Sequence, residues 1–168
     1  MKKSILVLGL SLVFLFSFGL VVQAQTGKEI IEPVTSTWYV TFKNLPLDKD
    51  CVFQTWEAFG IVISDTGTGL FHGATVRCMG SVYVDKGVFR DDLAYGVYVL
   101  QNGDKAFFRT VFNRKPGELA KGTTTLIGGT GKCAGIQGSY DLTGYPLKPA
   151  MEGIFQSYNK LSIKYKLP

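Results

Sequence analysis

Short runs of alternating apolar and polar side chains recur along this chain, and glycine-rich turns separate them. Within residues 37–42, Trp38, Val40 and Phe42 occupy every second position. A period of two residues is typical of a half-buried β-strand, and no segment shows a convincing helical period with caps. The pattern therefore predicts a chain built from strands.

Further strands are predicted where this pattern or a β-rich composition recurs, at residues 51–64, 75–84, 93–100, 105–113, 123–127, 138–142, 153–158 and 161–165. The dipeptide Asn102-Gly103 separates two of these runs. It is the strongest hairpin signal in the chain, because both residues tolerate the positive φ of a type I′ turn. We therefore expect residues 94–100 to pair with residues 105–113.

About eight short strands with regular turn signals predict an all-β domain, either a closed antiparallel barrel or a β-sandwich. We favour the barrel, because neighbouring runs are suited to pair in sequence and closure removes the exposed strand edges. Residues 28–31 and the loop at residues 119–120 are the only candidates for a short helix.

The N-terminal residues 1–24 have the features of a secretory signal peptide. Lys2 and Lys3 give a positive start, residues 4–22 form an almost uninterrupted apolar run, and Val22-Gln23-Ala24 fits a cleavage site. The alternative is a retained membrane anchor, since a run of about 19 residues is long enough to span a bilayer. We favour cleavage after Ala24.

Residues 25–168 then form a single domain that is exported, periplasmic or secreted, and not membrane-spanning after cleavage. Loss of Lys2 and Lys3 with the leader lowers the formal net charge from +5 to +3. Binding to nucleic acid usually requires a clustered basic stripe, and the basic residues here are scattered. We therefore expect no nucleic-acid partner.

Three cysteines, Cys51, Cys78 and Cys133, would enter an oxidising compartment, which predicts one disulfide and one free thiol. All three pairings are open, and we favour Cys51 with Cys78. No metal site is expected, because the chain has no C-x-x-C motif and a single histidine.

The most distinctive string is the glycine-rich segment at residues 128–138. Gly129, Gly131 and Ala134 satisfy a loose G-x-G-x-x-A pattern. A dinucleotide site needs a following helix whose N-terminus faces the pyrophosphate, whereas another strand is predicted here. The segment therefore predicts a tight connection with positive φ at glycine, and neither a nucleotide nor any other cofactor is expected.

The same segment carries a family resemblance. The string GGTGK at residues 128–132, followed by Ala134-Gly135 and by Gly138 at the start of a strand, resembles the glycine-rich turn of the allene oxide cyclase and dirigent superfamily. It is also similar to uncharacterised exported bacterial proteins of this length. Cys133 departs from the pattern, because an apolar and often aromatic residue is expected there.

The resemblance implies an eight-stranded antiparallel barrel around a hydrophobic cavity, with no cofactor. In that superfamily, allene oxide cyclases steer ring closure of an unsaturated fatty-acid epoxide, and dirigent proteins hold radical or quinone-methide intermediates. No catalytic acid of either family can be matched to a position in this chain. The resemblance therefore supports the fold more than an activity.

Two titratable residues are candidates for catalysis. Glu57 shares one face of its predicted strand with Phe53 and Phe59. If this face looks into the barrel, the carboxylate lies in a low-dielectric cavity and its proton is available for acid or base chemistry; otherwise it faces solvent. His72 follows the turn at residues 65–69, so we expect it on the barrel rim.

Four other residues are candidates for ligand binding. Arg77 and Arg109 each interrupt an apolar strand. A guanidinium that faces the interior could bind a ligand carboxylate through two hydrogen bonds, whereas the ordinary alternative is a solvated surface residue. Trp56 and Tyr98 would supply apolar contacts, although aromatic residues of this kind more often belong to the core.

Three functions fit these observations. The first is an exported, cofactor-free β-barrel that binds a small apolar or amphipathic molecule, since eight strands enclose space for one small ligand. The second is a cyclase or isomerase in which Glu57 or His72 moves protons and an arginine holds an anionic tail. The third is a structural or protein-interaction domain with a filled barrel. The oligomeric state is left open.

Overall fold

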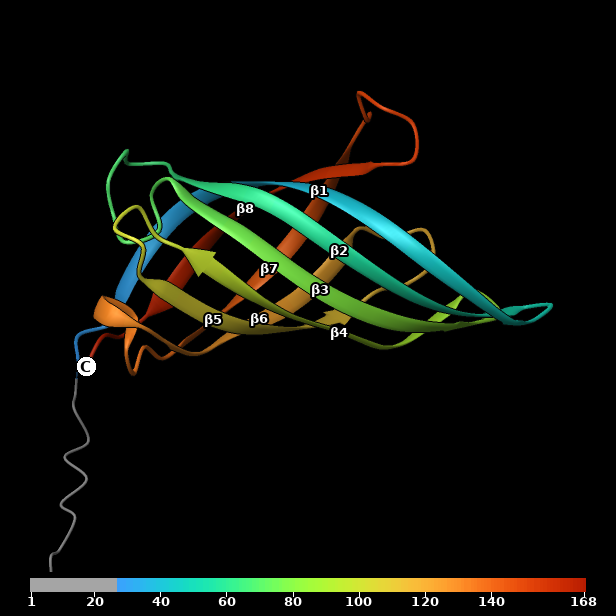
Figure 1. Ribbon diagram of the computed structural model, residues 1–168, viewed down its shortest axis with the longest axis horizontal. Helices are drawn as coiled ribbons and strands as arrows, with labels where there is room; N and C mark the ends of the chain where they lie inside the picture. Colours follow the sequence, from blue (N-terminus) through green and yellow to red (C-terminus); the bar gives the residue numbers. More distant parts are fainter. Residues whose placement is uncertain (1–26) are drawn as a thin grey trace, which may run out of the picture.

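Strands β1 to β8 follow one another around a closed antiparallel barrel in the computed structural model, which describes residues 27–168 (Figure 1). Each strand pairs with the next, and β8 closes the barrel against β1. The all-β closed barrel is thereby confirmed over the β-sandwich. The predicted signal peptide, residues 1–24, lies outside the described residues.

The strands are longer than the sequence pattern predicts. Residues 153–165 contain one strand instead of two, and the helix expected at residues 28–31 is wrong because β1 already begins at Ile30. The strands are β1 (Ile30–Asp48), β2 (Cys51–Ser64), β3 (Ala74–Asp85), β4 (Val88–Val99), β5 (Lys105–Asn113), β6 (Ala120–Gly129), β7 (Gly138–Leu147) and β8 (Phe155–Tyr165). Within residues 27–168, no helix is long and apolar enough to cross a membrane.

The predicted hairpin between β4 and β5 is confirmed, with Val99 opposite Lys105. Its turn is not of type I′, because only Gly103 has a positive φ, at 86°. The Asn102 side chain instead donates to Asp104 Oδ2 at 2.7 Å and accepts from the Asp104 N–H at 3.1 Å. These bonds hold a turn that needs a left-handed conformation only at glycine.

The glycine-rich segment connects β6 to β7, as expected, through a short 3-10 helix at Gly131–Cys133. Gly131 and Gly135 have positive φ values of 54° and 75°, a region that is costly for residues with a Cβ. The Lys132 N–H donates to Asp104 Oδ2 at 2.9 Å, so this connection packs against the β4–β5 turn. The segment is a tight connection between strands.

The cysteines do not form the predicted disulfide. Cys51 lies opposite Asp85 and Cys78 lies opposite Ala58 on the β2–β3 ladder, so the two thiols are seven residues apart along the strands. That spacing corresponds to about 23 Å, whereas a disulfide requires Cα atoms within about 7 Å. All three cysteines are free, which corrects the Cys51–Cys78 assignment.

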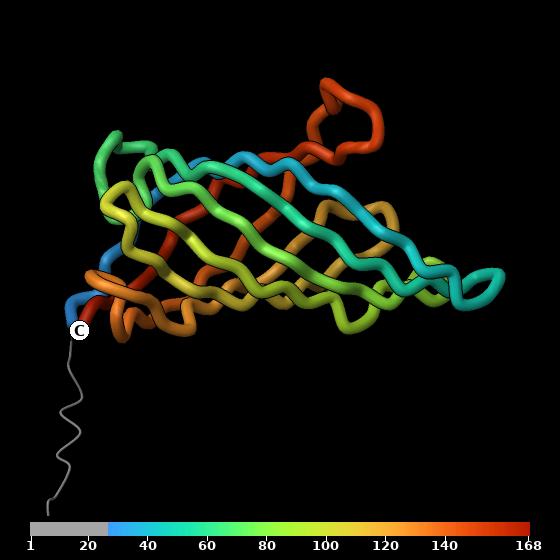
Figure 2. The backbone as a smooth tube through the Cα atoms, in the orientation of Figure 1, coloured from blue at the N-terminus to red at the C-terminus, as the bar shows by residue number. Residues whose placement is uncertain are grey.

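One half of the barrel, which we call the packed half, is filled by side chains. The β2–β3 loop folds over this end, beside the β4–β5 turn, the glycine-rich connection and the C-terminus (Figure 2). The loop inserts Phe71, which is 0% exposed and lies edge-on to Tyr98 at 5.1 Å and to Tyr165 at 5.4 Å between ring centroids. Ile136 and Ile163 complete this core.

A buried carboxylate anchors the loop. Glu32 on β1 accepts hydrogen bonds from the backbone N–H groups of Leu70, at 3.0 Å, and Phe71, at 3.1 Å. It also accepts one from the Tyr165 hydroxyl at 3.3 Å. Burial raises the pKa of Glu32 above its ordinary value, although these hydrogen bonds oppose the shift.

The raised pKa predicts a pH-dependent contribution to stability. The folded state holds the Glu32 proton more tightly than the unfolded state does, so this group lowers the free energy of unfolding as the pH rises from its ordinary pKa through its raised folded pKa. Glu32→Gln keeps an oxygen acceptor and removes this titration. Urea unfolding from about pH 4 to about pH 8 should therefore show that the free energy of unfolding of the variant, relative to that of the parent, increases as the pH rises. A difference in free energy of unfolding between parent and variant that stays the same at every pH would contradict this account.

Candidate functional site

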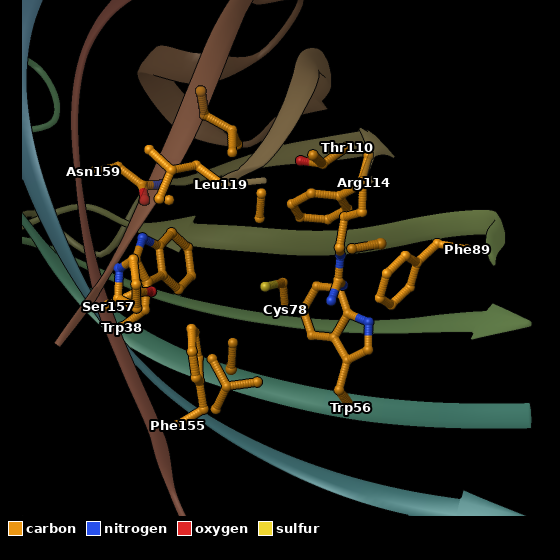
Figure 3. A pocket seen from close by; sticks show the side chains of 18 of the residues that line it. Trp38, Trp56, Cys78, Phe89, Thr110, Arg114, Leu119, Phe155, Ser157 and Asn159 are labelled. Carbon is orange, nitrogen blue, oxygen red and sulfur yellow. The ribbon is translucent and has the colours of Figure 1, made fainter. Parts of the chain in front are cut away.

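The other half of the barrel, which we call the hollow half, contains a cavity of about 470 Å³. Inward-facing side chains of the strands surround it, and residues of the β5–β6 loop lie at its mouth (Figure 3). On β1 the expected alternation is confirmed, because Trp38, Val40 and Phe42 all face this cavity. The walls are therefore mainly apolar.

Small residues keep this half open. Ala58 and Ala94 line the cavity where larger inward-facing side chains would fill it. Gly80 and Gly96 have a related role, because a Cβ at Gly80 would overlap the Trp56 indole and a Cβ at Gly96 would overlap the Phe108 ring. The aromatic rings can therefore lie against the barrel wall and leave the centre free.

The inner end of the cavity, where it meets the packed half, is polar, and we call it the floor. The hydroxyls of Tyr98 and Tyr140 are 2.5 Å apart, and those of Thr110 and Thr124 are 2.8 Å apart. Tyr98, Thr110 and Thr124 line the cavity, together with the Cys78 thiol. The floor thus combines hydroxyl and thiol groups without a charged side chain.

Burial keeps the floor uncharged at neutral pH. Desolvation raises the pKa of Tyr98 and of Tyr140 above that of an exposed tyrosine. Desolvation, with a smaller contribution from the Glu57 charge, raises the pKa of the Cys78 thiol to about 12. Cys78 is therefore a poor nucleophile, because its reactive form is the thiolate.

An ion pair stands at the mouth of the cavity. Arg114 Nε lies 2.5 Å from Asp92 Oδ2, and its Nη2 donates to Asp92 Oδ1 at 3.2 Å. The guanidinium also stacks over Phe89, at 5.6 Å from the ring centroid, and over Phe112, at 5.2 Å. Burial raises the pKa of Asp92, and the adjacent guanidinium opposes that shift. The ion pair therefore fixes these side chains at the mouth of the cavity and adds little net charge there.

The predicted ligand contacts are divided between the inside and the outside of the barrel. Trp56 and Tyr98 line the cavity. Arg109 is exposed on the outer face of β5, opposite Tyr95. Arg77 also lies outside, where its Nε donates to Glu57 Oε1 at 2.6 Å. The structure therefore brings together two of the four ligand-binding candidates and leaves both arginines away from the cavity.

The side chains of the two catalytic candidates do not face the cavity. Glu57 is on the outer face because Trp56 and Ala58, its neighbours on β2, face inward. His72 lies in the loop over the packed half, where its Nδ1 accepts a hydrogen bond from the Ser64 N–H at 3.3 Å and its side chain borders a second hollow. Neither residue lines the cavity.

Several site residues have no distinctive sequence signal. Thr110, Thr124 and Tyr140 come from three different strands and meet only once the barrel closes. Asp92 follows Asp91, whose φ of 52° accompanies a register shift in the β3–β4 ladder. Within residues 27–168, no group of three His, Cys, Asp or Glu side chains is arranged to hold a metal ion.

Comparison with known proteins adds no assignment. No family model matches the sequence, and no curated protein is significantly similar to it. The closed eight-stranded barrel is the fold that the resemblance to allene oxide cyclases and dirigent proteins implies. Membership of that superfamily stays a prediction.

Proposed function

We propose that this protein is a cofactor-free barrel that binds one small, mainly apolar molecule in its hollow half. The cavity of about 470 Å³ carries the proposal. Its volume falls within the range of about 300–1,000 Å³ that is usual for small-molecule pockets. Aromatic and aliphatic walls with few polar groups suit such a ligand.

The contrast between the two halves favours ligand binding over a purely structural role. Protein interiors are normally close-packed, and empty apolar space lowers stability. Phe71 fills the packed half, whereas Ala58 and Ala94 leave space in the hollow half. Larger side chains at those two positions would reduce this empty space.

The cyclase or isomerase alternative receives less support. Its proton-transfer residues were to be Glu57 or His72, and neither side chain lines the cavity. General acid–base catalysis requires the group to reach the reacting atoms directly or through one water.

The signal peptide predicted at residues 1–24 supports export as part of the proposal, so the ligand would be a molecule of the periplasm or the extracellular medium.

Titration with the neutral fluorescent probe N-phenyl-naphthylamine tests this function. We expect saturable binding of one probe per chain, with rising probe fluorescence. Ala58→Phe places a ring in the cavity and should weaken binding by about tenfold or more, a loss of about 1.4 kcal/mol. Thr75→Phe adds the same ring at an exposed position on the neighbouring strand and should leave binding unchanged. Equal affinities for both variants and the parent would contradict the proposal.

A further inference from the structure

Four buried hydroxyls form a row across the floor of the cavity. Tyr98 on β4 contacts Tyr140 on β7 at 2.5 Å, and Thr110 on β5 contacts Thr124 on β6 at 2.8 Å. Tyr140 lies opposite Thr124 on the β6–β7 ladder, so the two pairs lie side by side. All four residues are at most 5% exposed. We call this set the hydroxyl row, with Tyr98 and Thr110 at its ends.

Each of the two hydroxyl pairs has one more hydrogen than it can use. Each hydroxyl carries a single hydrogen, so in each pair two hydrogens serve one contact. Among residues 27–168, these four hydroxyls form no other hydrogen bond. The unused hydrogen of the threonine pair is therefore on Thr110 or Thr124, and that of the tyrosine pair is on Tyr98 or Tyr140.

The unused hydrogens face the cavity. Thr110 and Thr124 both line it, so the threonine pair presents a hydrogen to its interior whichever of the two donates. In the tyrosine pair, donation from Tyr140 to Tyr98 leaves the unused hydrogen on Tyr98, which also lines the cavity. The reverse arrangement would leave it on Tyr140 in the solid interior, where a donor without an acceptor is unfavourable. Figure 3 shows Thr110 and the Cys78 thiol among the side chains that line this cavity.

Charge restricts the acceptor that the floor can take. The charged residues that line the cavity, Arg114, Lys115 and Glu118, all belong to the β5–β6 loop at the mouth. Arg114 is already paired with the buried carboxylate of Asp92. A carboxylate on the floor would therefore be a buried anion without a cationic partner, which is strongly unfavourable. An uncharged oxygen can accept the hydrogen bond without this penalty.

We propose that the ligand is a neutral, mainly apolar molecule with a carbonyl-type oxygen, and that this oxygen enters first and accepts a hydrogen bond from a hydroxyl of the row, Tyr98, Thr110 or Thr124. The proposal rests on the proposed function, because it names the ligand class for the same cavity. The apolar remainder of the ligand would lie against Trp38, Phe42 and Phe108. Carboxylic acids of the same shape would bind more weakly.

Three naphthalenes of similar shape test the proposal by displacement of N-phenyl-naphthylamine. They are acetonaphthone, which has a ketone, ethylnaphthalene, which has no acceptor, and naphthoate, which is a carboxylate. In the parent we expect acetonaphthone to bind more tightly than ethylnaphthalene, and naphthoate to bind most weakly. Tyr98→Phe/Thr110→Val/Thr124→Val removes the three hydroxyls that line the cavity and should reduce the ketone-to-hydrocarbon affinity ratio by about tenfold. Ethylnaphthalene should bind this variant as it binds the parent.

The chain offers matched controls. Tyr95→Phe/Thr123→Val/Thr125→Val removes the same three kinds of hydroxyl from exposed positions on β4 and β6, and the affinity ratio should stay at the parent value. If ethylnaphthalene and the probe do not bind the parent, the proposed function fails. If they bind but both triple variants keep the parent ratio, only the hydroxyl-row proposal fails. Binding of naphthoate as tight as that of acetonaphthone would overturn the proposed neutrality.

A measurement on the parent keeps the proposal testable even if the inner triple variant does not fold. The infrared stretch of the acetonaphthone carbonyl moves to lower frequency when the oxygen accepts a hydrogen bond. We expect this shift in the bound ketone relative to the ketone in an alkane solvent. A bound carbonyl with the alkane frequency would show that the floor donates no hydrogen bond to it.

Discussion

Replacing Phe71 by alanine is expected to lower the free energy of unfolding by about 3–5 kcal/mol. The ring is fully buried, and it closes the packed half between Tyr98 and Tyr165. Its removal would leave a void that the surrounding strands cannot collapse to fill, because the barrel ladder fixes their spacing. Urea unfolding of the parent and the variant measures the difference.

Phe59→Ala is the matched control for this substitution. Phe59 is 44% exposed on the outer face of β2, so loss of its ring removes less buried contact. We expect a change of at most about 1 kcal/mol for it. Similar losses for the two variants would contradict the assignment of Phe71 to the core of the packed half.

Arg114→Met is expected to lower the free energy of unfolding at neutral pH by about 3 kcal/mol, because it leaves the buried Asp92 carboxylate without its cation. The Asp92 side chain is 2% exposed, and the guanidinium is its ion-pair partner. Methionine retains much of the apolar stem, so packing against Phe89 and Phe112 changes less than the charge does.

The cost of Arg114→Met should depend on pH. Burial already raises the pKa of Asp92, and loss of the guanidinium removes the main opposing influence, so the folded pKa rises further. The variant is therefore least destabilised in acid, where Asp92 is protonated, and the cost grows as the pH rises above the raised folded-state pKa of Asp92 in the parent. Arg90→Met, which removes an exposed arginine 3.9 Å from Asp85, should cost less than about 1 kcal/mol. A pH-independent cost for Arg114→Met would contradict the buried pair.

The fold could be predicted because its determinants are local. The alternation of Trp38, Val40 and Phe42 identifies both a strand and its inner face. The turn at Asn102-Gly103 identifies a hairpin, and the ladder places Val99 opposite Lys105. A succession of such hairpins is sufficient to predict an antiparallel barrel.

The inner face of β2 could not be predicted in the same way, because large apolar residues occupy both faces of that strand. Phe59 and Ile61 are exposed on the outside, while Trp56 and Ala58 face inward. The sequence pattern therefore left the orientation of Glu57 open. Local composition assigns a strand more readily than it assigns the face that becomes buried.

Strand register is a second feature that limits what the sequence can predict. The β3–β4 ladder shifts register between Ser81 and Tyr83, and the β5–β6 ladder shifts between Phe107 and Phe108. A shift of one residue exchanges the two faces of a strand. The hydroxyl row depends on the register of four strands at once, which no local spacing in the sequence specifies.

The most direct test of ligand binding in the hollow half is to locate a bound molecule with methyl-labelled alanine. Ala58 and Ala94 line the cavity, whereas Ala74 and Ala106 are buried in the core but do not line it. We expect intermolecular nuclear Overhauser effects from bound acetonaphthone to the methyl groups of Ala58 and Ala94, and none to those of Ala74 and Ala106. Contacts to Ala74 and Ala106 alone, or to none of the four methyl groups, would contradict binding in this cavity.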